Sequence, residues 1–113
     1  MHELSLLENV REIIESHARS QQFTKVIRIT LEIGKLSCVE PDALRFGFYV
    51  VMKGSPAEEA ELVITESDGI GICRQCGQHT VMETLYDPCR LCGSPFVEVV
   101  QGGEMKIRDL LVI

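Results

Sequence analysis

Two copies of a C-x-x-C-G element constrain this chain more than any other feature of its sequence. They read Cys73-Arg74-Gln75-Cys76-Gly77 and Cys89-Arg90-Leu91-Cys92-Gly93, and we call each copy a knuckle. Two thiolates three positions apart on a tight turn can reach one ion, and the following glycine lets the backbone fold beneath the sulfurs. Two knuckles therefore predict a tetrahedral four-sulfur site of the zinc-ribbon kind.

Disulfides and a rubredoxin-type iron are the alternatives for this site. Disulfides fit a cytosolic chain poorly, because thiols there usually stay reduced. Iron also binds four sulfurs and remains open, although zinc is the commoner occupant of a closed site. Because such a site has no open coordination position, we predict a structural rather than catalytic zinc, bound by Cys73, Cys76, Cys89 and Cys92.

Length and charge narrow the possibilities further. A chain of 113 residues is one domain, or one domain with a small satellite. Eleven Lys and Arg against 17 Asp and Glu give a net charge of -6, the wrong sign for a protein that neutralises phosphates. We see no charged-then-apolar leader and no apolar run of about 18–20 residues, so we expect a cytoplasmic protein that contacts neither nucleic acid nor membrane.

Hydrophobic periodicity predicts two helices and two strands before the knuckles. An amphipathic helix opens the chain, with an apolar face at Leu4, Leu7, Val10, Ile14 and Ala18. A strand follows over 26–33, with apolar residues at Ile27, Ile29, Leu31 and Ile33. A second helix starts at Pro41, and its inner side carries Leu44, Phe48, Val51 and Met52. Another strand lies around 61–66.

From 69 to about 101 the cysteines, glycines and prolines concentrate, and the apolar periodicity ends. About 33 residues are too few to fold on their own core, so metal binding would provide their folding energy. The apolar tail needs a sheet to join, which the strands at 26–33 and 61–66 could supply. The predicted fold class is α/β (α+β): a domain of residues 1–68, completed by a strand within 102–113, with a zinc module inserted at 69–101.

The amino terminus offers a second set of metal donors. The α-amine of Met1, the amide nitrogen and imidazole of His2, and the amide nitrogen of Glu3 can form adjacent chelate rings around one ion. Square-planar nitrogen ligation suits Ni(II) or Cu(II) rather than zinc. A bulky second residue disfavours removal of the initiator methionine, so we expect Met1 to keep a free amine.

Two further residues could carry chemistry. Cys38 lies outside the knuckles, and we expect it to be a small buried hydrophobic residue; the alternative is a reactive thiol, but no nearby cation in the sequence would activate it. His79 follows Cys76 closely and could exchange as a ligand, although an exposed loop histidine is the simpler interpretation. We find no nucleophile–base pair and no phosphate-binding glycine loop, so we predict no enzymatic activity.

Three parts of the sequence together resemble the HypA/HybF family of hydrogenase nickel-incorporation proteins. They are the opening MHELSL, the segment EIGKLSCVEPDALRFGF, and the two knuckles followed by a short terminal strand. The resemblance implies a three-stranded sheet with two helices, and a metallochaperone that delivers Ni(II) as cargo to [NiFe] hydrogenase. It implies nickel at Met1, His2 and Glu3, with Glu40 as an acidic residue nearby, and Zn(II) at the four knuckle cysteines.

The resemblance also implies partners. These are the nickel-handling GTPase of hydrogenase maturation, HypB, and the precursor of the [NiFe] hydrogenase large subunit. The resemblance does not decide whether the chain forms a homodimer, which is possible, or whether it also supplies nickel to urease. The competing hypothesis is a zinc-ribbon module that binds nucleic acid or another protein without nickel, but residues 69–101 hold only Arg74 and Arg90 against Glu83, Asp87 and Glu98.

Overall fold

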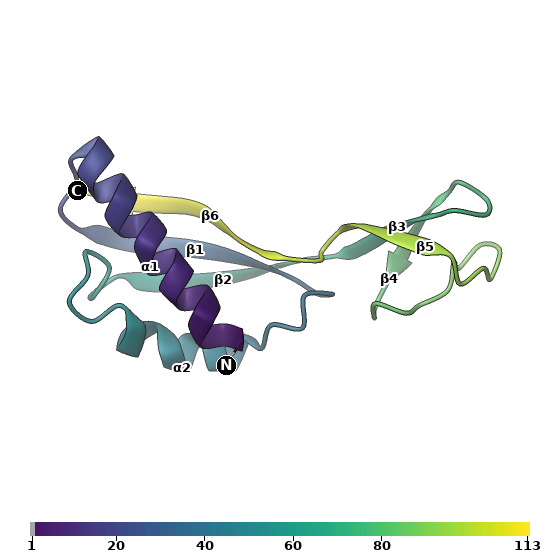
Figure 1. The fold of residues 1–113 in the computed structure, drawn as a ribbon, viewed down its shortest axis with the longest axis horizontal. Helices are drawn as coiled ribbons and strands as arrows, with labels where there is room; N and C mark the ends of the chain where they lie inside the picture. The colour runs from purple at the N-terminus through teal and green to yellow at the C-terminus, as the bar shows by residue number, and fades with distance from the viewer. Residues whose placement is uncertain (1) are drawn as a thin grey trace. The chain divides into compact units, whose positions relative to one another are not determined.

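The computed structural model describes residues 2–113 and, for His2, the main chain alone. These residues form two helices and six strands, labelled in Figure 1, in the order α1 (His2–Gln21), β1 (Val26–Gly34), α2 (Pro41–Val51), β2 (Glu61–Ser67), β3 (Gly69–Cys73), β4 (His79–Met82), β5 (Val97–Gln101) and β6 (Met105–Val112). No helix in this part of the chain is long and apolar enough to cross a membrane.

The described residues divide into two compact units. The first unit holds the chain up to Leu31, Val39–Thr65 and Ile107–Ile113, and the second holds Glu32–Cys38 and Glu66–Lys106. Each unit is built around one three-stranded sheet, in the order β2-β1-β6 for one sheet and β4-β3-β5 for the other. The predicted fold class, a small three-stranded sheet with two helices and an added cysteine module, is confirmed.

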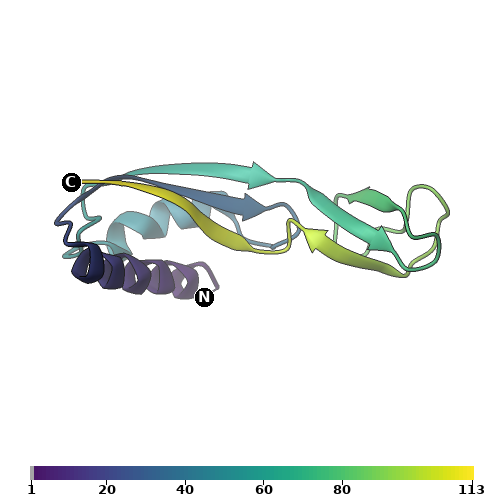
Figure 2. The same cartoon turned by 90° about the horizontal axis from the view of Figure 1, so that it is seen from above.

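The helices of the first unit lie on one side of the β2-β1-β6 sheet, as Figure 2 shows. Its core consists of fully or almost fully buried side chains from both helices and from β1, among them Leu7, Val10, Ile14, Ile29, Leu31, Leu44 and Phe48. Among the predicted inner-face residues, Leu4 and Ile27 are exposed, each at 37%, and Ala18 and Val51 are only half-buried. At the start of β1, Val26 is buried in place of Ile27, and its N–H donates to the Pro56 carbonyl. Two exposed residues follow, and the alternation of buried side chains begins at Ile29.

Helix α2 starts where the sequence predicts, at Pro41, directly after the extended residue Glu40. Gly47 lies against α1, because a Cβ atom placed there would come within 3.1 Å of Leu7 Cδ1. At the other end of α2, the guanidinium of Arg11 donates to the carbonyls of Val51 at 2.8 Å and Lys53 at 3.0 Å. Since the last carbonyls of a helix have no internal partner, Arg11 of α1 caps α2.

The second sheet was not anticipated from the sequence as a sheet. Strand β3 pairs antiparallel with β4, from Gly69 opposite Met82 to Ile72 opposite His79, and antiparallel with β5 on its other edge. An irregularity at Ile70/Gly71 interrupts the β3–β5 register. In the Gly69–Gln101 segment, Met82 is the only buried hydrophobic side chain besides two cysteines. The segment therefore has almost no apolar core of its own.

Glycines allow the main chain to approach itself closely in the second unit. A Cβ atom at Gly34 would overlap the main chain of Gly102, and Gly102 itself has a φ of 85°. Hydrogen bonds fasten this crossing, from Gly34 N–H to the Glu104 carbonyl at 3.0 Å and from Leu36 N–H to the Gly102 carbonyl at 2.9 Å. This crossing anchors the short segment that joins β5 to β6.

Candidate metal centre

The two knuckles have the same main-chain hydrogen bonds. In the first, Cys73 N–H donates to the Gln78 carbonyl at 2.9 Å, and Gly77 N–H donates to the Cys73 carbonyl at 2.8 Å. The second repeats both bonds at the same lengths, from Cys89 to Ser94 and from Gly93 to Cys89. Gly77 and Gly93 both lie in the left-handed region, at φ 76° and 77°. The glycine that closes each knuckle is therefore needed for its backbone conformation.

The four knuckle sulfurs converge on one point. Their Sγ atoms all lie within 4.8 Å of one another. The Cys73 and Cys92 sulfurs are 3.6 Å apart, and those of Cys76 and Cys89 are 3.8 Å apart. A tetrahedron with Zn–S bonds of about 2.3 Å has edges of about 3.8 Å, whereas a disulfide needs about 2.05 Å. The donor set and its spacing therefore fit a four-sulfur zinc site, and all four cysteines are free thiols.

Hydrogen bonds and burial divide the sulfurs into two kinds. Cys73 and Cys89 are buried, while Cys76 and Cys92 are exposed. The amides of Gln75 and Cys76 both donate to Cys73 Sγ at 3.4 Å. Such N–H···S bonds stabilise a thiolate, which is the form that binds a metal. The turn geometry thus supplies part of the charge compensation that four thiolates require.

The thiol pKa values follow this division. The Cys76 amide, more than any other group, lowers the pKa of Cys73 to about 6, and the Cys92 and Leu91 amides lower the pKa of Cys89. At Cys92 the Ser94 amide acts in the lowering direction, but the Cys73 sulfur, partial desolvation of the Cys92 sulfur itself and the other sulfurs together raise the pKa to about 12. Without metal, the first cysteine of each knuckle is thus the thiolate that its neighbours stabilise.

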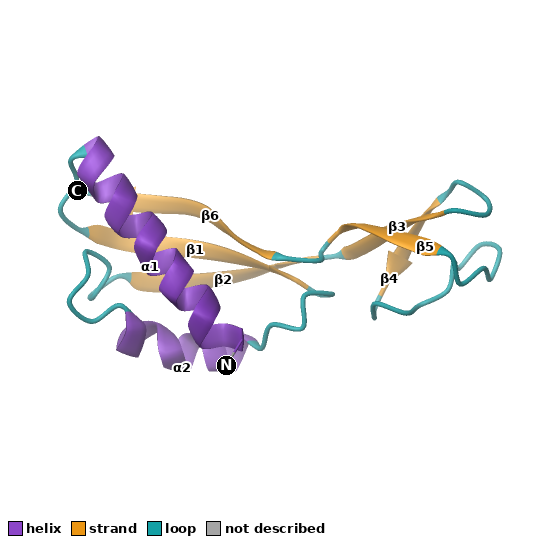
Figure 3. Cartoon of the chain, in the orientation of Figure 1, coloured by secondary structure: helices purple, strands orange, loops and turns teal. Residues whose placement is uncertain are grey.

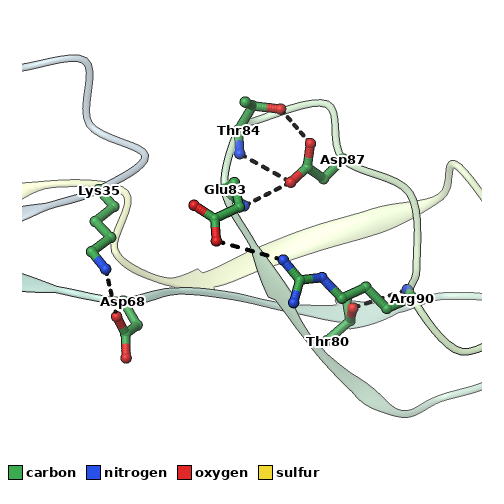
Figure 4. A network of polar contacts seen from close by, with 7 residues as sticks. All are labelled: Lys35, Asp68, Thr80, Glu83, Thr84, Asp87 and Arg90. Atoms are coloured by element: carbon green, nitrogen blue, oxygen red, sulfur yellow. Dashed lines mark hydrogen bonds and ion pairs between the residues drawn. The ribbon is translucent and has the colours of Figure 1, made fainter.

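The loop before the second knuckle is held by a compact polar network, drawn in Figure 4. The Asp87 carboxylate accepts hydrogen bonds from the amides of Glu83 at 2.7 Å and Thr84 at 3.1 Å and from the Thr84 hydroxyl at 2.6 Å. These bonds, the Thr84 hydroxyl first, lower the pKa of Asp87. Thr80, nearly buried on β4, accepts from the Arg90 amide at 3.1 Å. Asp87 and Thr80 together fix where the second knuckle begins.

Sequence reasoning missed these supporting residues. The pair Asp87-Pro88 directly before the knuckle is a turn signal that could have indicated the loop. No local pattern indicates Thr80, because its partner lies ten residues away on another segment.

Both arginines of the module are paired with carboxylates. Arg74 forms an ion pair with Glu98, and Arg90 lies 3.6 Å from Glu83. A domain that binds nucleic acid needs cations directed at phosphates. The module therefore presents no unopposed arginine to a phosphate backbone.

The remaining predicted site residues lie apart from this cluster. His79 is exposed on β4, opposite Ile72, and the metal-binding group comprises the four cysteines without it. Cys38 is exposed, contrary to the expectation that it is buried. The reason is local: its φ of 61° lies in the left-handed region, between the buried Leu36 and Val39. Met1 and the side chain of His2 lie outside the described residues.

Glu3 and Glu40, by contrast, meet. Glu40 N–H donates to Glu3 Oε2 at 3.3 Å, which joins the first turn of α1 to the start of α2. Residues 37 positions apart in the chain are thus adjacent at the amino-terminal end of both helices.

Comparison with protein families identifies the chain. Residues 1–112 match the family described as "Hydrogenase/urease nickel incorporation, metallochaperone, hypA". The chain belongs to this HypA family. The HypA family acts in nickel incorporation during hydrogenase maturation. The family description names a metallochaperone and not a catalyst.

Two relatives and one solved structure match this chain over all or nearly all of its length. "Hydrogenase maturation factor HypA" of Cereibacter sphaeroides strain KD131 is 46% identical over 112 residues, 99% of each chain. The protein of that name from Paracoccus denitrificans is 44% identical over 113 residues, 100% of each chain. The solution structure of "the Ni metallochaperone HypA from Helicobacter pylori" is similar with a TM-score of 0.77 at 26% identity, covering 98% of this chain and 97% of that one.

Proposed function

We propose that this HypA-family chain is a nickel metallochaperone, which binds Ni(II) at its amino terminus and delivers it during maturation of [NiFe] hydrogenase. The observation that carries the proposal is the family match over residues 1–112. We propose further that it works in the cytoplasm with the nickel-handling GTPase HypB and the hydrogenase large-subunit precursor, without contact to membrane or nucleic acid. Residues 1–68 with 102–113 would be the nickel domain, and 69–101 the zinc module.

Nickel would be bound by the Met1 amine, the amide and imidazole nitrogens of His2, and the Glu3 amide. The start of α1 supports this set. Because α1 begins at His2, the His2 and Glu3 amides are among the first four of the helix, which have no carbonyl partner within it. They can lose their protons to a metal without breaking a helical hydrogen bond. Glu40, held beside Glu3, would place a carboxylate near the cation.

Release follows from the same donor set. Every amine or amide donor must lose its proton before it binds. The nickel affinity should therefore fall by about tenfold for each unit by which the pH is lowered, for each proton released on binding. A ligand set at the end of the chain can also be exchanged one donor at a time by a partner. The chain therefore combines binding with transfer and needs no turnover of substrate.

The four-cysteine site would hold Zn(II) as a structural ion. Zinc supplies a redox-inert, four-coordinate link between the two knuckles. With four sulfurs the site has no position for a substrate, and Met82 is nearly all the apolar core that the module has. The residues themselves therefore act by folding: the amides of Gln75 and Cys76 hold the Cys73 thiolate, and Asp87 and Thr80 hold the approach to Cys89.

Nickel titration of the untagged, zinc-loaded chain tests the amino-terminal site. We expect one nickel per chain with the absorption spectrum of square-planar nitrogen ligation. His2→Ala and a chain with residues added before Met1 should both lose this binding, while His17→Ala, which changes a histidine of α1 at an exposed position, should keep it. Equal tight binding by all four proteins would reject the site.

A further inference from the structure

Strand β3 of the cysteine module directs its apolar side chains away from the packed side of its sheet. Successive side chains of a strand point to opposite faces, so Ile70 and Ile72 lie on one face, and Gly69, Gly71 and Cys73 on the other. In antiparallel sheets the apolar residues usually occupy the face that packs on a core. In β3 the glycines and Cys73 are buried, whereas both isoleucines are only half-buried.

The glycine face is the one that the rest of the module covers. A Cβ atom at Gly69 would come within 2.6 Å of Leu36 Cγ, and one at Gly71 within 2.7 Å of the Met82 sulfur. Thr80, which pairs with Gly71, is nearly buried and accepts a hydrogen bond from an amide of the second knuckle. This face therefore takes glycine because other parts of the module pack closely against it.

The opposite face gathers the isoleucines with neighbours from both flanking strands. Residues paired across antiparallel strands lie on the same face. Ile70 is opposite Val81 of β4 and Gln101 of β5, and Ile72 is opposite His79 of β4 and Glu98 of β5. We call the face formed by these six residues the outer face.

The centre of the outer face is apolar and open to solvent. Val81 is 46% exposed beside the half-buried Ile70 and Ile72, and the polar residues at the edges are all exposed. Single exposed apolar residues are ordinary, but three adjacent branched side chains on a rigid sheet mark an interaction surface. A strand that keeps isoleucine for its open face and glycine for its packed face has apolar surface to offer a partner.

The dimensions of the outer face fit one helix. Figure 3 shows strands and loops between Gly69 and Gln101 and no helix, so the module has none of its own to cover this sheet. An apolar sheet face is buried by packing a helix or a second sheet against it. Three strands make a face about 10 Å wide, which is the diameter of one helix. The five residues of β3 span about 16 Å, the length of about 11 helical residues.

The charge of the module selects a basic partner. Residues 69–101 contain no lysine, and their two arginines are outnumbered by Glu83, Asp87 and Glu98. Both arginines are already paired with carboxylates. Bound Zn(II) would not reverse this balance, because the four thiolates that hold it carry two more charges than the ion. Glu98 lies on the outer face itself.

We propose that the outer face docks an amphipathic helix of a partner protein. The helix would have about three turns, with its apolar side against Ile70, Ile72 and Val81 and with lysine or arginine along its flanks. The surface contains none of the nickel donors, so the chain would attach to this partner through the cysteine module. Docking therefore does not depend on nickel binding.

A nuclear magnetic resonance titration of the untagged, zinc-loaded chain tests the proposal. The probe is a synthetic peptide of about 14 residues, with leucine at spacings of three and four and lysine elsewhere. We expect amide signals of β3, β4 and β5 to shift. Ile72→Thr should weaken binding by at least about tenfold, and Val81→Thr should act in the same direction. Threonine keeps the branched shape that suits a strand, so the sheet should remain.

One control variant and two control peptides separate this surface from general attraction. Leu91→Thr changes a 67% exposed residue of the second knuckle, outside the outer face, and should bind like wild type. A peptide with glutamate in place of lysine should bind at least about tenfold more weakly. So should a peptide of the same residues reordered so that the leucines share no face.

Circular dichroism and zinc content identify any variant that fails to fold, and the peptide comparison gives an answer that needs no variant. Absence of binding at millimolar peptide would overturn the proposal, as would shifts confined to α1 and α2. Binding that ignored Ile72→Thr, or that was equal for the lysine and glutamate peptides, would also reject it. Shifts confined to the edge of β4 or β5 would mean that the partner adds a strand, and the helix would be rejected.

Discussion

The main-chain amide of Glu40 donates a hydrogen bond to Oε2 of Glu3, across 3.3 Å. Glu40 precedes α2, and its own side chain makes no capping bond to that helix. The carboxylate of one helix thus restrains the residue that starts the other. Because the Glu3 amide is also a proposed nickel donor, this contact holds the donor end of α1 in place beside α2.

Removing the Glu3 carboxylate should therefore affect both stability and nickel binding. We expect Glu3→Ala to lower the free energy of unfolding by about 1 kcal/mol through loss of the hydrogen bond. Nickel affinity should fall at least about tenfold, as is usual when the group that orients a metal ligand is removed. Glu3→Gln keeps an acceptor and should lose less. Urea unfolding and nickel titration measure the two effects, with Glu8→Ala as the control on the exposed side of α1. Identical behaviour of Glu3→Ala and Glu8→Ala would contradict the assigned role.

Replacing Cys73 and Cys76 together by serine should unfold the cysteine module and leave the helices intact. The reason is that Met82 is almost the only apolar side chain buried between Gly69 and Gln101, whereas α1 and α2 share a core with β1. We expect zinc content to fall from one ion per chain to none, and amide protection to be lost in β3–β5 but kept in α1. Cys38→Ser, which changes an exposed cysteine outside the site, should keep full zinc. Stoichiometric zinc in the double variant would show that the ligands are other residues.

Gly34→Ala should be strongly destabilising. The added methyl group would overlap the main chain of Gly102, which cannot move aside because its carbonyl accepts the Leu36 amide. We expect a loss of about 3 kcal/mol in denaturant unfolding. Gly103→Ala is the matched control, since its Cβ would meet only a Val99 methyl group at 3.5 Å, an ordinary contact. Equal stability of the two variants would mean that the crossing is looser than the structure shows.

Much of this fold can be predicted from local patterns. The apolar spacing of Leu7, Val10 and Ile14 indicates the face of α1, because residues three and four apart meet on one side of a helix. The knuckles are equally local, since the spacing of Cys73 and Cys76 alone lets both reach one ion. Pro41 predicts the first residue of α2 for the same reason, because its fixed φ suits a helix start.

The features that sequence reasoning missed depend on residues far apart or on backbone conformation. Arg11 caps a carbonyl 40 positions away, and no local pattern records that contact. Strand β3 has the sequence GIGIC, in which glycines remove the side chains whose alternation would indicate a strand. Cys38 looks like a small core residue in the sequence, but its left-handed φ turns it outward. Burial of such a residue cannot be inferred from its type alone.

Asp87→Asn should speed the removal of zinc by a chelator severalfold, because Asp87 holds the loop that leads to Cys89 through three hydrogen bonds. Its pKa is lowered below the ordinary value of 3.8, so its contribution is fully present above that value and is lost only as pH falls through the lowered pKa. The difference between Asp87→Asn and wild type should therefore stay constant across the neutral range. A difference that changed with pH near neutrality would assign the effect to another group. Glu98→Gln, on β5, is a control for the loss of one charge in the module.

Arg11→Ala should destabilise the first unit through the end of α2. The guanidinium donates to two carbonyls, those of Val51 and Lys53, which lie where a helix has no internal donors left and where its dipole favours a cation. We expect a loss of about 1–2 kcal/mol in the free energy of unfolding, and faster hydrogen exchange in the last turn of α2. Glu15→Ala is the matched control, because it removes only the Arg11–Glu15 ion pair on the surface and should cost about 0.5 kcal/mol or less. If Glu15→Ala were as destabilising as Arg11→Ala, the ion pair rather than the cap would be the stabilising contact.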